Sequence, residues 1–562
     1  MTWTGWLLIA VCMAAVGIMA PLLGGYMAQV FTAERTPLHP VLRPIEVLIY
    51  RLAGVDEQRE QSWFTYALCF LGFHLVGVLV LYGLFRMQTW FPWNPQHLPG
   101  LTPDLSLNTA ISFVTNTSWQ SYAGEATLSY FSQMAGIVVA SFLSAAAGVA
   151  VAIVLIRGFA RSGSETVGNF WVDMTRATLY VFLPLAVLGA VVLASQGAPQ
   201  TLHPSAAAAT VEGARQTIAL GPVASQESIK LLSGDGGGFF NANSAHPFEN
   251  PNGLTNLVEI LLILVVGAAL TNTFGRMIGS QRQGWMLLGV MAVLFLGGAA
   301  AIYAAETHGN PVLAHLGVAG SNMEGKEVRF GPAGSSLFAE ASTASADGAV
   351  NSMHDSYMPL SGLVLMANMK IGEVIVGAPG SGLFSILLFA ILAVFIAGLM
   401  VGRTPEYLGK KIETREVQFA MLASLAAPAI TLTLAAIAAV IPLGLAAREA
   451  TGAHGLSEIL YAYTSAAATN GSAFAGLSAN NSFYNLTLAL GMMVGRFAVI
   501  LPTLALAGSL AAKTKAAPSA GAMPTDNLLF AGLLVGVILI VGGLIYFPAL
   551  ALAPILEQLS LR

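Results

Sequence analysis

Four short polar turns, each set between long apolar stretches, hold the residues of this chain that are best suited to bind an ion. The turns span 115–120 (TNTSWQ), 234–238 (GDGGG), 345–348 (SADG) and 469–472 (TNGS). Glycine and Asn or Asp tolerate left-handed backbone angles, which let successive carbonyl oxygens face one axis. Carbonyl oxygens in that arrangement can replace the hydration shell of a monovalent cation. The turns are therefore candidates for an ion-binding ring.

A short helical segment precedes each turn. These segments lie at 107–114, 226–232, 335–341 and 457–463, about two helical turns each, and are too short to cross a hydrocarbon layer of about 30 Å. A half-helix points its negative C-terminal end toward the middle of the membrane, where it favours a cation. Non-helical backbone at that depth is tolerated only in a water-filled cavity or inside protein. The fourfold pattern of helix, half-helix, loop and helix predicts a cation pore.

Each turn taken alone has an ordinary alternative. Asn-Gly and Asp-Gly pairs are common in surface turns. The three glycines at 236–238 could suggest a phosphate-binding loop, but no Gly-Lys-Ser/Thr follows them. The recurrence of polar turns at corresponding places in four helix pairs favours the pore.

The composition places these turns in a membrane protein. Of the 562 residues, 56% are hydrophobic and 9% are charged, and the mean hydropathy is +0.72. Charged surface is too scarce for a water-soluble fold, and the net charge of −4 includes no basic tract that would favour nucleic acid as a partner. We expect an all-α membrane protein with ten transmembrane helices, at about 3–25, 62–85, 127–156, 177–196, 254–274, 285–304, 358–402, 417–443, 483–509 and 527–550.

The distribution of Lys and Arg predicts the orientation. One set of connections between the ten spans holds fifteen of the 24 basic residues, and the other set holds seven. Cytoplasmic loops carry the excess of Lys and Arg. Both termini and all four polar turns are therefore expected on the outer side.

Four longer motifs resemble one known family. They are 115–122 (TNTSWQSY), 236–250 (GGGFFNANSAHPFEN), 402–411 (GRTPEYLGKK) and 470–477 (NGSAFAGL). Together they closely resemble the potassium-binding A subunits of bacterial Kdp potassium-transporting ATPases, and the resemblance covers essentially the whole chain. It implies potassium as the bound ion, no organic cofactor and a place in the bacterial inner membrane with periplasmic termini. It also implies three partners, which are a catalytic P-type B subunit, a C subunit and a small F subunit.

The resemblance further implies four helix-pore-helix repeats of the type found in potassium channels and Trk transporters. The repeats would span 60–160, 175–280, 285–410 and 415–512, with an extra transmembrane helix at 1–30 and another at 525–562. The chain itself would not be an enzyme, and the sequence has no Asp-Lys-Thr-Gly phosphorylation motif and no Walker loop. The ion would pass through an intramembrane tunnel to the B subunit.

The filter residues follow from the same resemblance. They are Thr115, Asn116, Thr117, Gln120, Asp235, Gly236, Gly237, Gly238, Ser345, Asp347, Gly348, Asn470 and Gly471. Asp235 and Asp347 depart from the residues expected for the family, and Ser118 stands where the family usually has Asn. The two carboxylates either strengthen the cation field at the filter or point into the vestibule as solvated turn residues. The first turn lacks glycine and the second has three consecutive glycines, so we expect an unequal filter.

The seventh span is too long for one straight helix. Gly377, Pro379, Gly380 and Gly382 predict a break within it. The break is either a packing kink or a block below the filter that diverts the ion sideways, which would suit a pump.

Five other basic residues are singled out by their position. Arg496 lies inside the ninth span, where it either acts on the ion beneath the filter or extends to the cytoplasmic interface. Lys370 could pair with Glu373 across one helical turn. Arg403, Lys410 and Lys411 are expected to anchor a helix end or to contact anionic lipid.

Two function classes fit the loops. One is the ion-binding subunit of a primary pump, and the other is a self-sufficient potassium transporter or channel of the Trk kind. The four-loop pattern fits both classes, and the longer motifs favour the first.

Overall fold

The computed structural model describes residues 1–318, 320–402, 404–516 and 523–561. Within these residues, ten helical segments are long and apolar enough to cross a membrane, which confirms the predicted number. Their elements are α1 (Trp3–Phe31), α3 (Trp63–Arg86), α6 (Val139–Ala160), α7 and α8 (Phe170–Arg176 and Leu183–Ser195), α10 (Gly253–Met277), α11 (Gln281–His308), α15 (Ser381–Val401), α16 (Thr414–Val440), α19 (Ser482–Ala512), and α20 with α21 (Leu528–Leu550 and Leu556–Ser560).

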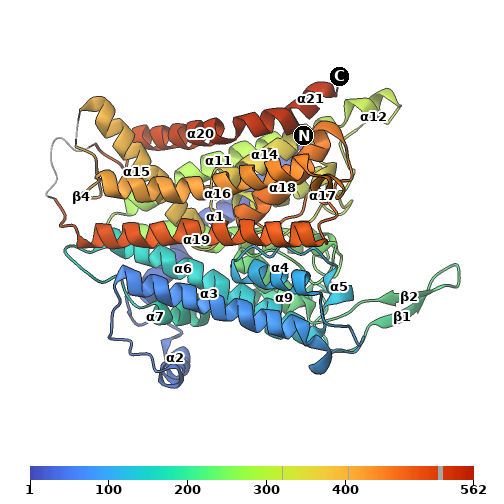
Figure 1. The fold of residues 1–562 in the computed structure, drawn as a ribbon, viewed down its shortest axis with the longest axis horizontal. Coiled ribbons are helices and arrows are strands. Elements are labelled where there is room, and N and C mark those ends of the chain that lie inside the picture. Colours follow the sequence, from blue (N-terminus) through green and yellow to red (C-terminus); the bar gives the residue numbers. More distant parts are fainter. Residues whose placement is uncertain (319, 403, 517–522, 562) are drawn as a thin grey trace.

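The long helices run roughly side by side along the longest axis of the molecule (Figure 1). A β-hairpin of β1 (Ala206–Ala209) and β2 (Arg215–Ile218) projects from one end of this bundle, which we call the hairpin end. Both ends of the chain also lie at the hairpin end (Figure 1). An even number of crossings requires this common side for the termini.

The centre of the bundle is built around α6. Residues 145–156 of this helix are all buried, because they pack against protein on every side. A helix that is hydrophobic all round belongs in such a position. By contrast, 28% of the residues in the most apolar stretch of α1, of α3 and of α20 are buried, compared with 72% in the span that contains α6. These three helices are therefore peripheral and present most of their surface to lipid.

The seventh span is broken, as its glycines predict. Its first part is α14 (Pro359–Lys370), its second part is α15, and residues 371–380 between them are not helical. The break ends just before Gly382, which lies in the first turn of α15 and not in the loop. Gly377 and Gly380 adopt left-handed angles, with φ of 69° and 105°.

Several elements outside the ten spans and the four half-helices were not anticipated from the sequence. The hairpin β1–β2 lies in the connection between the predicted fourth and fifth spans. The helix α2 (His39–Ala53) connects α1 to α3 and is seen nearly end-on in Figure 1, so it lies across the long helices. Its apolar residues Val41, Ile45, Leu48 and Leu52 are exposed along one side.

Candidate ion filter

Four short helices precede the polar turns, and each begins earlier than the sequence predicts. They are α4 (Pro103–Val114), α9 (Val223–Ser233), α13 (Gly331–Ala344) and α18 (Gly452–Ala467). Where labelled, they lie in the half of the bundle nearer the hairpin end (Figure 1). Pro103 in α4 and Pro332 in α13 stand in the first turn, where proline costs no hydrogen bond. The C-terminal end of each helix leads directly into a polar turn.

All four helices end in the same way. In each, a backbone N–H bonds to the carbonyl five residues earlier, and the residue before that N–H is left-handed. The bonds are Thr117 to Ser112 at 2.9 Å, Asp235 to Lys230 at 3.4 Å, Asp347 to Ser342 at 3.0 Å and Asn470 to Ser465 at 2.9 Å. The left-handed residues are Asn116, Gly234, Ala346 and Thr469, with φ of 61°, 58°, 56° and 50°.

A second left-handed residue follows two positions later in every loop. These residues are Ser118, Gly236, Gly348 and Gly471, with φ of 56°, 69°, 80° and 87°. Such angles are strained for serine and unstrained for glycine. The glycine-free first loop thus has the same two left-handed positions as the other three, so the backbone is more alike than the glycine content suggests. Loop 2 alone has a third left-handed residue, Gly237, with φ of 74°. The loops also differ in their side chains.

The four loops form a closed ring in sequence order. Asn116 Nδ2 donates to the carbonyl of Gly234 at 2.8 Å, which joins loop 1 to loop 2. The other three joints are backbone approaches so close that a Cβ on the glycine would overlap the neighbouring loop. They are Gly236 against the Asp347 carbonyl, Gly348 against the Asn470 carbonyl, and Gly471 against the Thr117 carbonyl. Each loop thus touches the next, and loop 4 returns to loop 1.

The two aspartates of the filter loops are buried and accept hydrogen bonds from the protein. Asp235 and Asp347 are both 0% exposed. Ser118 and Ser144 donate their hydroxyl hydrogens to Asp235, while the Ala349 N–H donates to Asp347 Oδ1 at 3.0 Å. The alternative that these are solvated turn residues is therefore wrong.

A wide cavity of about 920 Å³ opens over the ring toward the hairpin end. Its lining includes residues that follow each of the four loops, such as Tyr122, Asn241, Val350 and Phe474. Gln120 also lines it and accepts a hydrogen bond from the Gly238 N–H at 2.9 Å. The cavity is thus a shared vestibule for the four loops.

The other side of the ring is covered by the break in the seventh span. The Gly377 N–H donates to the Ala344 carbonyl at the end of α13, at 3.2 Å. A Cβ on Gly234 would meet Ala378 and Pro379. Residues 371–380 therefore lie directly against the third pore helix and the second filter loop.

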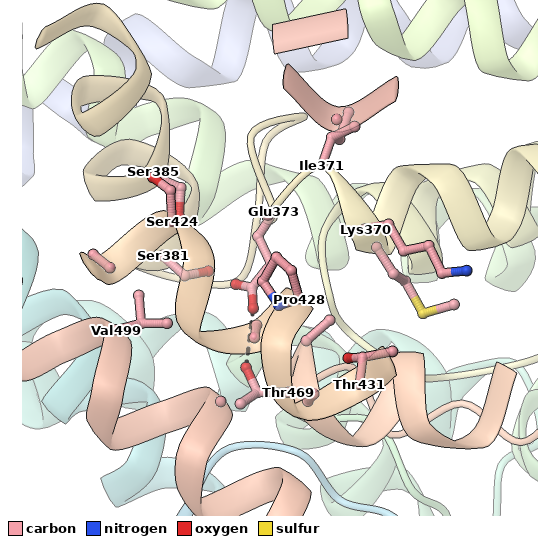
Figure 2. Close-up of a pocket in the computed structure, with 18 of the residues that line it drawn as sticks. Lys370, Ile371, Glu373, Ser381, Ser385, Ser424, Pro428, Thr431, Thr469 and Val499 are labelled. Carbon is pink, nitrogen blue, oxygen red and sulfur yellow. Dashed lines mark hydrogen bonds between the residues drawn. The ribbon is translucent and has the colours of Figure 1, made fainter. Parts of the chain in front are cut away.

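A second and smaller cavity, of about 60 Å³, lies beside this break (Figure 2). It has room for a few water molecules. Glu373, Thr469 and Arg496 are among its lining residues, and Thr469 Oγ1 donates to Glu373 Oε1 at 3.0 Å. Arg496 is 4% exposed and donates to the Ser144 carbonyl at 2.9 Å, so the alternative that it extends to the interface is wrong.

Comparison with known proteins identifies the family of this chain. A family model described as the potassium-transporting ATPase A subunit matches residues 10–559. The chain belongs to this family. It is 58% identical to the potassium-transporting ATPase potassium-binding subunit of Methylorubrum extorquens over 560 residues, which cover 100% of this chain and 98% of the relative. It is also 58% identical to the subunit of the same name from Rhodopseudomonas palustris, covering 100% of this chain and 99% of that one.

A solved structure shows the same fold outside the A-subunit family. The crystal structure of the potassium transporter TrkH from Vibrio parahaemolyticus matches with a TM-score of 0.52 and 14% identity. The match covers 89% of this chain and 96% of that chain. At this identity the likeness is one of fold alone, and it confirms the predicted Trk-like architecture.

The charged pair expected within the broken span is absent from this A-subunit chain. Lys370 and Glu373 point in different directions (Figure 2). Among the described residues, Lys370 Nζ has no hydrogen-bond partner and lies 5.3 Å from the centre of the Tyr546 ring. The prediction fails because α14 ends at Lys370, so Glu373 is not one helical turn further along the same helix.

The structure describes two of the three basic residues expected to anchor a helix end or to contact anionic lipid. Lys410 is buried, and its ammonium group donates to the carbonyls of Arg161 and Lys513 at 2.6 and 2.5 Å. These two residues are the C-caps of α6 and α19, so Lys410 joins two helix ends and does not contact lipid. Lys411 is exposed beside Glu413, at 3.2 Å. Arg403 lies outside the described residues.

Several residues around the filter were missed from the sequence. Ser144 holds Asp235 from α6, and Asn243 donates its amide to the Gly237 carbonyl. Lys230 is buried at the end of α9 among acidic side chains. A signal for Lys230 was present, because a charged residue in a membrane-embedded segment is a functional candidate. The sequence held no comparable signal for Ser144.

Proposed function

We propose that the ring of four loops is the site at which this A subunit selects and binds potassium. The observation that supports this most strongly is the closed ring itself. Four loops with the same pair of left-handed positions meet in sequence order, each at the C-terminal end of a half-helix. The proposed filter residues are the thirteen positions derived from the sequence.

The chemistry of the ring suits a dehydrated monovalent cation. Backbone carbonyls replace the water shell of the ion, and four negative helix ends lower its electrostatic energy. Buried carboxyl groups at Asp235 and Asp347 bring further oxygen atoms close to the loops. Residues 60–160, 175–280, 285–410 and 415–512 would each contribute one loop to the filter.

The ion would leave the ring sideways. Residues 371–380 lie against the ring on the side away from the vestibule, and Gly377, Pro379, Gly380 and the adjoining Gly382 let the chain approach it closely. The small cavity beside the break (Figure 2) would receive the ion. Arg496, which also lines it, would limit how long a cation stays there. A direct path across the membrane would dissipate the gradient that a pump builds.

The proposed partners follow from family membership. A catalytic P-type B subunit would hydrolyse ATP and receive the ion, and a C subunit and a small F subunit would complete the complex. The chain would have no catalytic activity and no organic cofactor. The hairpin end would face the periplasm across the bacterial inner membrane, because most Lys and Arg residues lie in connections at the opposite end.

A self-sufficient Trk-type transporter is the alternative function. The likeness to TrkH favours the shared fold without favouring this activity. Potassium uptake by this chain in vesicles without other subunits or ATP would support the alternative.

The test uses the complete complex, reconstituted in vesicles, and measures ATP hydrolysis against potassium concentration. Gly236→Asp would force a side chain into the loop 3 backbone, so we expect potassium stimulation to be lost or shifted at least about tenfold to higher concentration. Gly213→Asp is the matched control. Gly213 is also left-handed, with φ of 81°, but it lies in the turn of the hairpin with open space around it.

The two variants decide the proposal together. Loss of potassium dependence in Gly236→Asp with a normal response in Gly213→Asp supports the ring as the filter. An unchanged response in a Gly236→Asp complex that assembles would show that the second loop is not part of a filter.

A further inference from the structure

The second filter loop has the fewest side chains of its own among the four loops. Gly236, Gly237 and Gly238 follow one another, and glycine loses more backbone entropy on ordering than any other residue. The equivalent stretch of loop 4 is held differently, because Asn470 Oδ1 accepts a bond from the Ser472 N–H at 3.0 Å. A run of three glycines needs support from outside the loop.

That support comes from a buried group of charged and polar residues behind the loop. Lys230, at the end of α9, has four acceptor oxygens within reach of its ammonium group. They are Glu227 Oε2 at 2.6 Å, Asn243 Oδ1 at 2.7 Å, Glu249 Oε2 at 2.8 Å and Ser244 Oγ at 3.0 Å. The relative exposure of Lys230 is 2%, and those of Glu227 and Glu249 are 1% and 0%. An ammonium group so surrounded has a fixed position.

Two of these partners reach the second loop directly. Asn243 uses its Oδ1 to accept from Lys230 and its Nδ2 to donate to the Gly237 carbonyl. Glu249 uses Oε2 for Lys230 and Oε1 to accept from the Phe240 N–H at 2.7 Å. Lys230 therefore holds Asn243 and Glu249 in place. These two side chains in turn bind the backbone at Gly237 and at Phe240.

Lys230 is also the exception among the four pore helices. Its carbonyl accepts the bond that ends the helix, and the three residues in the same position are serines. They are Ser112, Ser342 and Ser465. A lysine occurs only behind the loop with three glycines, where the other loops have small hydroxyl residues.

We propose that Lys230, with Asn243 and Glu249, positions the backbone of the second filter loop and thereby sets ion selectivity. The inference rests on the proposed function of the ring. Lys230 is a positioning residue, since among the described residues its ammonium group contacts side chains behind the filter and not the loop carbonyls. Residues that orient ion ligands in this way typically change affinity by about tenfold or more when they are removed.

Two variants test the proposal in the reconstituted complex. Lys230→Met removes the ammonium group while keeping a long side chain. Asn243→Asp keeps the oxygen that faces Lys230 and replaces the amide donor to Gly237 with a second carboxyl oxygen. We expect each variant to raise the KM for potassium about tenfold and to reduce discrimination between potassium and rubidium. The kcat at saturating potassium should stay within about twofold, because the ion still reaches the pump once bound.

Arg157→Met provides the matched control. Arg157 forms a partly buried ion pair with Asp173 at 2.6 Å, at the end of α6 away from the hairpin end. Its loss should lower the thermal stability of the complex and leave the KM and the ion discrimination unchanged.

Each outcome decides the matter. An unchanged KM and discrimination in an assembled Asn243→Asp complex would overturn the proposal, even if Lys230→Met fails to assemble. Equal shifts in Arg157→Met would also overturn it, because a general loss of stability would then explain them. If Gly236→Asp abolishes potassium dependence while the Lys230 and Asn243 variants are normal, the filter stands and only this inference fails.

Discussion

Single side chains distinguish loops that share two left-handed backbone positions. Thr117, Asp235, Asp347 and Asn470 occupy equivalent positions, because their N–H groups make the same helix-ending bond. The side chains of Asp347 and Asn470 both accept from the N–H two residues on, which is a common turn for Asp and Asn. Asp235 instead accepts from Ser118 and Ser144. Two of the four equivalent positions thus bring a carboxylate to the filter.

Removal of these carboxylates should weaken potassium binding. For the double variant Asp235→Asn with Asp347→Ser, we expect the KM for potassium to rise between about threefold and tenfold, since a buried negative charge near a cation stabilises it. Sodium discrimination should change as well. The measurement is ATP hydrolysis by the complex against potassium, with and without sodium.

Asp56→Asn is the control for this charge change. Asp56 is exposed, in the connection between α2 and α3. If the double variant matches Asp56→Asn in both potassium and sodium dependence, the two filter carboxylates do not contribute to ion binding.

At the scale of elements, the broken seventh span depends on very close backbone packing. Its residues 376–379 touch α10 at Gly267, α6 at Gly148 and loop 2 at Gly234, where a Cβ would meet the break in each case. Gly382 lies against the Val376 carbonyl and the Gly377 N–H, where a Cβ would overlap both. The position of the break is therefore set by glycines on four elements.

Gly382→Ala should displace the break and open a leak. The added methyl group has no room beside Val376, so residues 376 and 377 must move away from the ring. We expect passive rubidium flux through the complex without ATP, which the native complex blocks. Gly289→Ala on α11 is the matched control, because nothing lies within 4 Å of its Cβ position. A tight Gly382→Ala complex would count against the break as a barrier.

At the scale of the whole molecule, the sequence predicted the fold well and the filter incompletely. The ten spans, the four half-helices and the break in the seventh span all have local signals, which are apolar length and clustered Gly and Pro. The left-handed angles of Ser118, Ala346 and Thr469 have no such signal, because these residues adopt them only where surrounding packing imposes them. The contacts of Lys230 and Ser144 join distant segments and were not predictable from spacing.

One contact at the hairpin end ties together three distant parts of the chain. His454, in the first turn of α18, lies 2.9 Å from Asp355 Oδ1 through Nε2 and 2.8 Å from Glu557 Oε1 through Nδ1. Asp355 follows loop 3, and Glu557 is in α21. The buried carboxyl group of Glu458 lies close to His454 and Asp355. Both ring nitrogens can donate to carboxylates only when the imidazole is protonated. Hydrogen bonds to Asp355 and then to Glu557 raise the pKa of His454 to about 10.

This contact should make the stability of the complex depend on pH. A pKa raised above the unfolded value of about 6.5 means that protonated His454 favours the folded state. Its contribution is complete below pH 6.5 or so and is lost as the pH rises toward the folded pKa of about 10. We expect His454→Gln to lower the Tm of the purified complex at pH 6, and the difference from the native complex to disappear near pH 10. His203→Gln, at an exposed histidine in the connection after α8, should have no effect at either pH. A constant Tm difference from pH 6 to pH 10 would show that His454 acts through its shape alone and not through its charge.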